Sequence, residues 1–386
     1  AYKPFAHDKF DETNENGCQF LGLITLVDPL KPTAKSTIAA AKRLGIQVKV
    51  ISGDSPEVTG KIGQEIGLIK DMAGVILGKD LEALPEDDWF EVVNNHQIFA
   101  RVAPETKLKI IKALQTKYSV GYLGEGINDA PALKVADVGL VVSQTSDVAR
   151  EAADILLLDT DLKTIIKGIE NGRLIFANIN KYIKCALSSN FGNFYSIAIL
   201  SLVLTFLPML PSQILLENVL SDFPLLAIAD DTVDASELHK TKTYQIKNIL
   251  PLILLLAAVS SIMDFTFFFF FRHYSQTTLP TLWYLMSLLT EIVLIFSVRS
   301  KKPIWKTTKI SKTLCGMCLI TLLIGISLPY LPLGQKYLLF VRPPMQGLIV
   351  IGGLLIIYAA LNELIKKLYY NKLAVNNSKQ IHYAIK

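Results

Sequence analysis

The sequence predicts an α/β domain with a doubly wound, mostly parallel sheet, followed by an all-α transmembrane bundle of six helices. Over residues 20–162, short apolar segments alternate with helix-compatible segments, which is the pattern of βα units. The whole chain is 51% hydrophobic and its mean hydropathy is +0.38, which is too apolar for an ordinary soluble protein. The apolar residues concentrate after Cys185, in stretches close to the ~20 residues that a helix needs to cross a bilayer.

The order of strands and helices in the α/β domain follows from apolar runs and their flanking turn residues. The expected strands are Leu21–Val27, Val48–Ser52, Ile98–Val102, Ser119–Gly124, Val138–Val142 and Ile155–Leu158. The expected helices are Thr33–Leu44, Pro56–Ile66, Glu105–Thr116, Asn128–Ala136 and Asp147–Ala153. Ser55 is a suitable N-cap for the second helix, and Gly45 and Gly67 are suited to end the first two helices.

The segment Tyr122–Pro131, with the sequence Y-L-G-E-G-I-N-D-A-P, joins an expected strand to an expected helix. Its glycines let the backbone turn sharply beside a bound anion. Glu125 and Asp129 flank the strand end, and two carboxylates near a phosphate site are what a hard cation such as Mg²⁺ requires. Ser52 and Asp54 also follow a strand end, where sites in parallel sheets lie, so we expect one shared site. An ordinary strand–turn–helix with surface acids is the alternative.

Three segments, in this order, resemble motifs of the P-type ATPases. Ile51–Asp54 (I-S-G-D) resembles the T-G-D motif of the family, and Ala100–Lys107 (A-R-V-A-P-E-T-K) resembles its R-x-x-P-x-x-K segment. Gly124–Pro131 resembles the G-D-G-x-N-D-x-P hinge motif, with Glu125 in place of the first Asp. The resemblance covers nearly the whole chain, from Gly22 to Tyr370.

The resemblance implies a haloacid-dehalogenase-like (HAD-like) phosphorylation domain, in which an aspartate is phosphorylated by ATP and then dephosphorylated. It assigns the chemistry to Ser52, Gly53, Asp54, Lys107 and Asn128, and the binding of Mg²⁺ to Glu125 and Asp129. Lys107 would supply positive charge to the transferring phosphoryl group, and Ser52 would hydrogen-bond one of its oxygens. By residue type alone, Ser52 is also a helix-capping residue and Lys107 is also an ordinary solvated lysine. Mg²⁺ is the expected cofactor and ATP the expected substrate.

The string D-K-T-G-T, which carries the phosphorylated aspartate in the family, does not occur in this sequence, and neither does the T-G-E-S motif. We therefore expect the C-terminal part of a longer pump, which would be inactive alone and would work with a missing N-terminal part. Residues 1–19 would be a remnant of the nucleotide-binding domain and hinge, and residues 20–162 the C-terminal part of the phosphorylation domain. The alternative from a non-enzyme class is a degenerate, inactive membrane protein.

The second half of the chain predicts a membrane domain at residues 185–371, after a stalk at 163–184 and before a polar tail at 372–386. The six expected spans are Cys185–Leu207, Pro211–Ala229, Ile249–Phe271, Leu279–Val298, Thr313–Leu331 and Met345–Leu364. Lysine and arginine gather in the loops on the side of the α/β domain, which predicts that this domain is cytoplasmic. The resemblance implies an integral protein of the plasma (bacterial inner) membrane. A net charge of +5 gives no indication of nucleic-acid binding.

Polar residues within these spans predict a site for the transported ion. A charge in the bilayer costs roughly 2.5–3.5 kcal/mol even on mild scales, so function is the default interpretation. Asn218, Ser221 and Asp222 are spaced to share one face of a helix, and Pro224 frees the carbonyl of Leu220 one turn earlier. The expected ligands are Asn190, Asn193, Glu217, Asn218, Ser221, Asp222 and Glu291. Asp264 serves packing or binding equally well, and a polar clamp between helices is the alternative for the whole set.

Asn218, Ser221 and Asp222 match the N-x-x-[ST]-D pattern of the sixth membrane helix of P-type cation pumps. The run Ser188–Asn193 (S-S-N-F-G-N) resembles the bacterial magnesium-transporting subgroup in particular. That resemblance implies Mg²⁺ as the transported cation, with a calcium or monovalent-cation pump as the alternative. Glu217 and Glu291 depart from the subgroup, which tends to have Gln at both positions.

Overall fold

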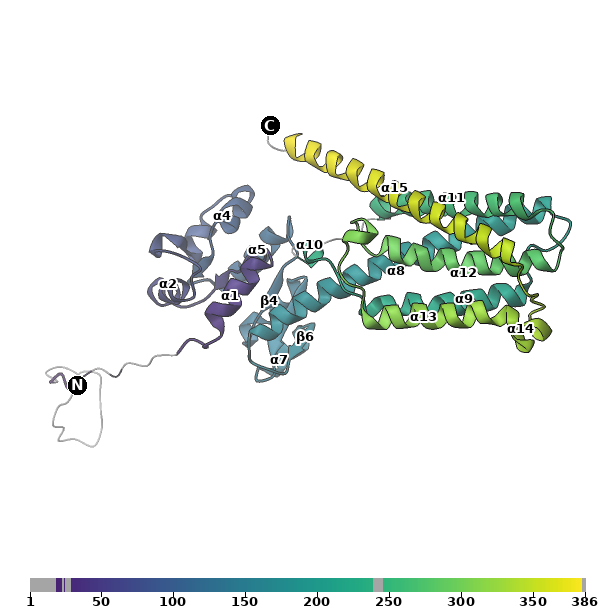
Figure 1. Cartoon of the computed structure of the whole chain (residues 1–386). Coiled ribbons are helices and arrows are strands. Elements are labelled where there is room, and N and C mark those ends of the chain that lie inside the picture. Colours follow the sequence, from purple (N-terminus) through teal and green to yellow (C-terminus); the bar gives the residue numbers. More distant parts are fainter. Residues whose placement is uncertain (1–18, 23, 25–28, 239–245, 384–386) are drawn as a thin grey trace. The chain divides into compact units, whose positions relative to one another are not determined.

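The computed structural model describes residues 19–22, 24, 29–238 and 246–383, with side chains up to residue 372 (Figure 1). The chain divides near Thr164 into two compact units, which we describe separately. Most of the expected strand Leu21–Val27 and nearly all of the expected remnant at residues 1–19 lie outside the described residues.

The first unit contains six short strands and seven α-helices among its described residues. The strands are β1 (Val50–Ile51), β2 (Val75–Leu77), β3 (Ile98–Ala100), β4 (Gly121–Leu123), β5 (Val138–Val142) and β6 (Ile155–Leu157). The helices are α1 (Ala34–Arg43), α2 (Pro56–Glu65), α3 (Gly78–Glu82), α4 (Trp89–Asn95), α5 (Pro104–Gln115), α6 (Ala130–Val135) and α7 (Asp147–Ala152). The 3₁₀ turns are η2 (Met72–Gly74), η3 (Glu86–Asp88) and η4 (Ile127–Asp129).

Every strand pair in the first unit is parallel, which confirms the predicted βα organisation. Within the described residues the strands form two sheets of three, in the orders β1-β3-β2 and β4-β5-β6, rather than one continuous sheet. The strand β3 is fully buried, with Ile98 and Phe99 in the core. The Ser55 hydroxyl accepts a hydrogen bond from the Val58 N–H and caps α2, as predicted. Gly67 follows α2 with φ +77°, the left-handed conformation that ends helices.

The second unit is helical. Its helices are α8 (Lys163–Val203), α9 (Pro211–Ala227), α10 (Ala235–Leu238), α11 (Ile246–Phe271), α12 (Thr278–Val298), α13 (Lys312–Ser327), α14 (Pro332–Tyr337) and α15 (Met345–Tyr383). The 3₁₀ turns η5 (Ile228–Asp230), η6 (Ile304–Lys306) and η7 (Leu328–Tyr330) follow α9, α12 and α13. The helix α8 is continuous, so the expected stalk and the first expected span form one helix.

Five helices of the described chain are long and apolar enough to cross a membrane, where the sequence predicts six spans. They are Lys163–Val203, Ile246–Phe271, Thr278–Val298, Lys312–Tyr330 and Met345–Lys372. The expected span Pro211–Ala229 does form the helix α9, but α9 is only 17 residues long and carries Glu217 and Asp222. α12 is the central helix, because it packs against α9, α11, α13 and α15.

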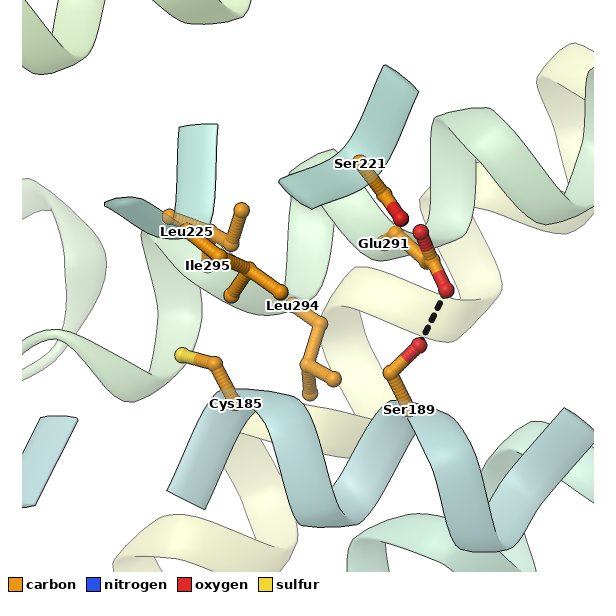
Figure 2. Close-up of a pocket in the computed structure, with 7 residues that line it drawn as sticks. All are labelled: Cys185, Ser189, Ser221, Leu225, Glu291, Leu294 and Ile295. Atoms are coloured by element: carbon orange, nitrogen blue, oxygen red, sulfur yellow. Dashed lines mark hydrogen bonds between the residues drawn. The ribbon is translucent and has the colours of Figure 1, made fainter. Parts of the chain in front are cut away.

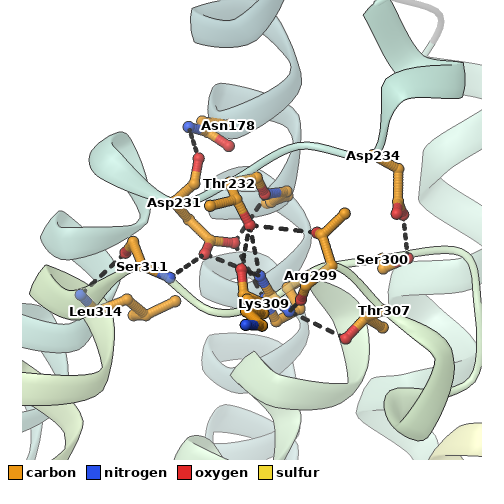
Figure 3. A network of polar contacts seen from close by, with 12 residues as sticks. Asn178, Asp231, Thr232, Asp234, Arg299, Ser300, Thr307, Lys309, Ser311 and Leu314 are labelled. Atoms are coloured by element: carbon orange, nitrogen blue, oxygen red, sulfur yellow. Dashed lines mark hydrogen bonds and ion pairs between the residues drawn. The ribbon is translucent and has the colours of Figure 1, made fainter.

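A buried ionic network lies at one end of the helical unit, where the segment after α9 meets α8 and the end of α12 (Figure 3). The Asp231 carboxylate is fully buried and accepts hydrogen bonds from Lys181 Nζ at 2.9 Å and from Arg299 Nη2 and Nε at 2.9 and 3.1 Å. Although burial raises the pKa of Asp231, hydrogen bonds from Arg299 and Lys181 hold it below its ordinary value. We call Asp231, Lys181 and Arg299 the Asp231 cluster.

Candidate functional site

The first group of predicted catalytic residues lies at the carboxyl end of β1. The Ser52 N–H donates to the Phe99 carbonyl at 2.9 Å, so Ser52 extends the pairing of β1 with β3. Its hydroxyl donates to Asp54 Oδ2 at 2.8 Å and accepts from the Asp54 N–H at 3.1 Å. The Arg101 N–H donates to the Asp54 carbonyl at 2.9 Å, and Arg101 has a φ of +50°, which is uncommon outside glycine. The predicted S-G-D and R-x-x-P-x-x-K segments are therefore joined by backbone hydrogen bonds.

The second group is centred on Asp129, in the turn η4 between β4 and α6. Lys107, in the first turn of α5, donates from Nζ to Asp129 Oδ1 at 2.8 Å. The Tyr122 hydroxyl, on β4, donates to the same oxygen at 2.8 Å. The N–H groups of Glu125 and Gly126 donate to the other oxygen, Oδ2, at 3.3 and 3.2 Å. Asp129 thus has four donors around its carboxylate.

Electrostatics in this group favour an ionised Asp129 beside a neutral Tyr122. Burial raises the pKa of Asp129, but the hydrogen bonds from Lys107 and Tyr122 bring it below the ordinary value of an aspartate. Burial, together with the neighbouring Asp129 carboxylate, raises the pKa of Tyr122 above that of an ordinary tyrosine. The phenol therefore keeps its proton and acts as a donor at neutral pH.

Gly124 is required for the close approach of β4 to Asp129. A Cβ atom at this position would lie 2.8 Å from Asp129 Cβ and 3.1 Å from Tyr122 Cε1, which is too close for any side chain. Asn128 is exposed, and α6 begins at Ala130 after the 3₁₀ turn, two residues later than the expected helix start. Pro131 lies in the first turn of α6, where its missing N–H costs nothing.

The residues at the end of β4 fit a hard cation. Mg²⁺ in proteins commonly takes one or two carboxylates and fills its other positions with water and substrate phosphate. Asp129 provides one carboxylate, and Glu125 provides a second one that is exposed to solvent. Among the described residues, no three or more His, Cys, Asp or Glu side chains are grouped so that they could hold a metal ion.

In the helical unit, Glu291 on α12 and residues of α8 form a buried polar cluster (Figure 2). Ser189 donates a hydrogen bond to Glu291 Oε1, and Asn193 Nδ2 donates to the same oxygen at 3.2 Å. Glu291 Oε2 is buried with no hydrogen-bond partner among the described residues. Ser189, Glu291 and the buried hydroxyl of Ser221 line one small cavity, together with Cys185, Leu225, Leu294 and Ile295.

A second, more open pocket of about 440 Å³ lies between α8 and α9 and collects four of the predicted ion ligands. The lining polar residues are Asn190, Asn193, Glu217 and Asn218. Glu217 is buried, and its Oε1 has no hydrogen-bond partner among the described residues. Asn193 lines this pocket and also bonds Glu291, so it connects the two polar regions.

The three polar residues of the second expected span are not equally placed. Ser221 is buried and its hydroxyl donates to the Asn218 carbonyl at 3.1 Å, whereas the side chains of Asn218 and Asp222 are exposed. Successive helix residues are rotated by about 100°, so the boundary between the inner and outer faces of α9 runs between Ser221 and Asp222.

The carbonyl of Leu220 corrects one expectation. Pro224 lacks an N–H, so the Leu220 carbonyl has no partner within α9 and was expected to face an ion. Instead, Thr321 on α13 donates its hydroxyl to this carbonyl at 3.1 Å, in a buried position. A neighbouring helix has satisfied the freed carbonyl, which is one of the ways proline is accommodated in membrane helices.

Asp264 on α11 is fully paired. Its Oδ2 accepts from Ser196 of α8 at 2.6 Å, and its Oδ1 accepts from Trp283 Nε1 of α12 at 3.0 Å. These contacts join three helices, and they favour the packing role over the binding role for Asp264. Ser189, Ser196, Trp283 and Tyr122 are site residues that the sequence did not predict. Ser189 had a signal, because it lies four residues before Asn193 on the same helix face.

Comparison with known proteins covers both units. A family model described as haloacid dehalogenase-like hydrolase matches residues 2–137, and one described as cation transporting ATPase, C-terminus, matches residues 206–368. The chain is 34% identical over 376 residues to the "Magnesium-transporting ATPase, P-type 1" of Salmonella typhimurium (strain LT2), which covers 95% of this chain and 41% of that protein. The protein of the same description from Escherichia coli (strain K12) is also 34% identical, over 95% of this chain and 42% of that protein.

A calcium pump is also similar, over a shorter region. The "Calcium-transporting ATPase 1" of Bacillus cereus (strain ATCC 10987 / NRS 248) is 35% identical over 239 residues, which is 60% of this chain and 27% of that protein. The chain spans 41–42% of the length of the magnesium-transporting relatives it matches. The two family models and the relatives that match 95% of the chain show that it belongs to the P-type cation-transporting ATPases and corresponds to their C-terminal portion.

Proposed function

We propose that this chain is the C-terminal part of an ATP-driven pump that moves Mg²⁺ across the plasma membrane through an aspartyl-phosphate intermediate. The phosphorylated aspartate would lie on a part of the pump that this sequence does not contain. Residues 20–162 would complete the phosphorylation domain on the cytoplasmic side, and residues 185–371 would form six membrane spans, with α9 as the short second one. The 386 residues alone would then have no ATPase activity.

In the phosphorylation domain, the contacts of Lys107 and Ser52 support the roles that we propose for these two residues. Lys107 would move its ammonium group from Asp129 to the transferring phosphoryl group and stabilise the charge there. The Ser52 hydroxyl, now on Asp54, would donate to a phosphoryl oxygen, while Gly53, Asp54 and Asn128 would shape the loops around it. Asp129 and Glu125 would hold Mg²⁺, which supplies positive charge to the phosphate oxygens when bound.

The observation that carries the transport function is the pair of buried carboxyl groups on α9 and α12. Glu217 Oε1 and Glu291 Oε2 have no hydrogen-bond partner, and neither residue forms an ion pair within the described part of the chain. Buried carboxylates without partners are costly, and a cation on the pathway of a transporter is their natural complement. We propose that this cation binds among Glu217, Glu291, Asn193, Ser189 and Ser221, with Asn190 and Asn218 on the open pocket and Asp222 on the outer face of α9.

The transport function is tested with the full-length pump that contains this chain, purified and labelled with γ-³²P-ATP at varied Mg²⁺ and Ca²⁺. We expect Glu291→Ala to raise the concentration of transported cation needed for half-maximal ATPase activity at least tenfold, because it removes both the charge and the oxygen atoms of a ligand. Asp264→Ala is the matched control, because Asp264 is also buried but is paired with Ser196 and Trp283, and it should change this concentration less than threefold. Equal effects of the two variants would refute the proposed ion site.

A calcium pump is the second candidate, and two observations favour it. One is the similarity to a calcium-transporting relative. The other is the presence of two buried glutamates in the site, because Ca²⁺ takes more oxygen ligands than Mg²⁺ and readily accepts carboxylates. Stimulation of phosphorylation by micromolar Ca²⁺ at constant Mg²⁺ would establish it. Phosphorylation that responds to neither ion would indicate a monovalent-cation pump, and no phosphorylation at all would indicate the degenerate, inactive membrane protein.

A further inference from the structure

Tyr122 is a polar residue of the first unit that the proposed mechanism does not use. Its hydroxyl donates to Asp129 Oδ1 at 2.8 Å, the same distance and the same oxygen as Lys107 Nζ. One carboxylate oxygen therefore has a neutral donor and a charged donor side by side. The two donors differ in how firmly they are held.

The Tyr122 phenol is fixed by the core of the domain. Its ring packs on the buried cluster formed by Leu133, Val141 and Ala149, and its backbone pairs with Gly139 in the β4–β5 register. Gly124 leaves the space in which the ring and Asp129 approach each other. A tyrosine side chain has two rotatable bonds, so packing of the ring fixes the position of the hydroxyl. Lys107 reaches Asp129 with a flexible four-carbon stem.

We propose that Tyr122 is a positioning residue for Asp129: its hydroxyl holds the carboxylate in place for Mg²⁺ when Lys107 leaves it for the phosphoryl group. This inference rests on the proposed function. When Lys107 leaves, Asp129 Oδ1 loses its charged donor and keeps only Tyr122, while Oδ2 keeps the N–H groups of Glu125 and Gly126. These three fixed donors leave acceptor positions on the carboxylate open to a metal ion, because an ionised carboxylate has about four lone-pair sites.

The expected loss of Mg²⁺ affinity follows from the role of hydrogen-bond donors that orient metal ligands. Removing a group that orients a metal ligand typically weakens metal binding about 10–100-fold. Tyr122→Phe keeps the ring, and therefore the packing on Leu133 and Val141, and removes only the hydroxyl. With Lys107 withdrawn, the N–H groups of Glu125 and Gly126 still donate to Asp129 in that variant, so we expect the lower end of the range, a roughly tenfold loss of Mg²⁺ affinity.

The test is isothermal titration calorimetry of the 386-residue chain in detergent with MgCl₂, with every variant made in a Lys107→Met background so that Asp129 has lost its charged donor. The Asp129 site is defined as the component of the binding heat that Asp129→Asn removes, which separates it from any binding in the helical unit. Tyr118→Phe is the matched control, because Tyr118 is an exposed tyrosine whose hydroxyl donates to Asn94 at 3.1 Å, away from Asp129. Tyr122→Met is a second variant without the hydroxyl.

We expect Tyr122→Phe and Tyr122→Met to weaken this component about tenfold and Tyr118→Phe to leave it within twofold. Far-UV circular dichroism establishes that each variant is folded. Unchanged affinity in Tyr122→Phe, with the component still lost in Asp129→Asn, would overturn the role of Tyr122 and leave the proposed function intact. If Asp129→Asn removed no Mg²⁺ heat, Asp129 would not hold the metal, and both this inference and the metal site of the proposed function would fail.

Discussion

The Asp231 cluster offers the sharpest test of how the helical unit is held together, through the variant Asp231→Asn. This change keeps the size of the side chain but removes the negative charge that both Lys181 and Arg299 contact. All three side chains are nearly inaccessible to solvent, at 0% for Asp231, 8% for Lys181 and 2% for Arg299. The variant therefore leaves two positive charges buried with a neutral acceptor between them.

The expected cost follows from this burial. Breaking a buried ion pair by removing one partner costs about 3–5 kcal/mol, because the remaining charge stays desolvated. An asparagine still accepts one hydrogen bond, and Arg299 keeps its bonds to Thr307 Oγ1 and the Thr308 carbonyl at 3.1 and 2.8 Å. We therefore expect Asp231→Asn to lower the free energy of unfolding of the helical unit by about 3 kcal/mol, the lower end of the range.

The assay is denaturant unfolding in detergent, followed by tryptophan fluorescence, since Trp283 is buried in the helical unit. Asp234→Asn is the matched control. Asp234 accepts from Ser300 at 2.6 Å and pairs at 3.1 Å with Lys302, whose side chain is half exposed, so its loss should cost only about 1 kcal/mol. If the double variant Asp231→Asn/Lys181→Met recovers part of the loss, the unpaired cation is the cause. A cost for Asp231→Asn no larger than that for Asp234→Asn would refute this reasoning.

Three further variants test single contacts. Gly124→Ala should lower the free energy of unfolding by about 1–3 kcal/mol in a thermal melt, because its Cβ would lie 2.8 Å from Asp129 Cβ. Gly126→Ala is the control and should lower the free energy of unfolding less, because its Cβ would have no contact under 3.7 Å. Thr321→Val should cost about 1–2 kcal/mol in the same denaturant assay, because it leaves the Leu220 carbonyl without its donor; no change would mean that another group replaces it. Asp129 has a pKa below its unfolded value, so the stability that it contributes is present above about pH 4 and is lost as the pH falls through its folded pKa. Urea midpoints of the first unit should therefore fall more steeply below about pH 4 in the wild type than in Asp129→Asn, and parallel curves would contradict this assignment.

The elements that could be predicted from the sequence are those long enough to show a periodic pattern and those whose contacts lie a few residues apart in the chain. The βα order, the parallel pairing and the cap at Ser55 follow from patterns a few residues apart, and the structure agrees with them. The strand β2, with α3 and α4 after it, was not predicted, because a three-residue strand such as Val75–Leu77 has no readable period. The single continuous sheet was expected from the same pattern, whereas the described strands form two sheets.

The same difference decides which site residues could be predicted: residues within a short motif could be selected from the sequence, whereas contacts between distant segments could not. The resemblance of two segments to P-type ATPase motifs selected Lys107 and Asp129, and the structure brings these two residues into contact. The sequence also indicated that Pro224 frees the Leu220 carbonyl, but it could not show that Thr321, 101 residues further along, donates to it. That contact depends on which face of α13 packs on α9. The sequence of one helix alone does not show which of its faces meets a particular neighbouring helix. Tyr122 was not predicted as a site residue for a related reason. A tyrosine in a strand is common, and only the folded turn brings Asp129 within hydrogen-bond distance of its hydroxyl.

The buried polar groups of the helical unit divide by whether the protein itself completes their hydrogen bonds. Asp264 and the Leu220 carbonyl are complete, each through donors from other helices, and a bundle gains stability from such contacts without any ligand. Glu217 and Glu291 are incomplete, since each has an oxygen with no partner in the described chain. In a hydrocarbon environment an incomplete carboxylate is costly, and no described lysine or arginine pairs with either one to offset that cost. The chain keeps its compensated charges in the Asp231 cluster and its uncompensated carboxylates beside Asn193, which is the arrangement expected if a cation from outside completes the second group.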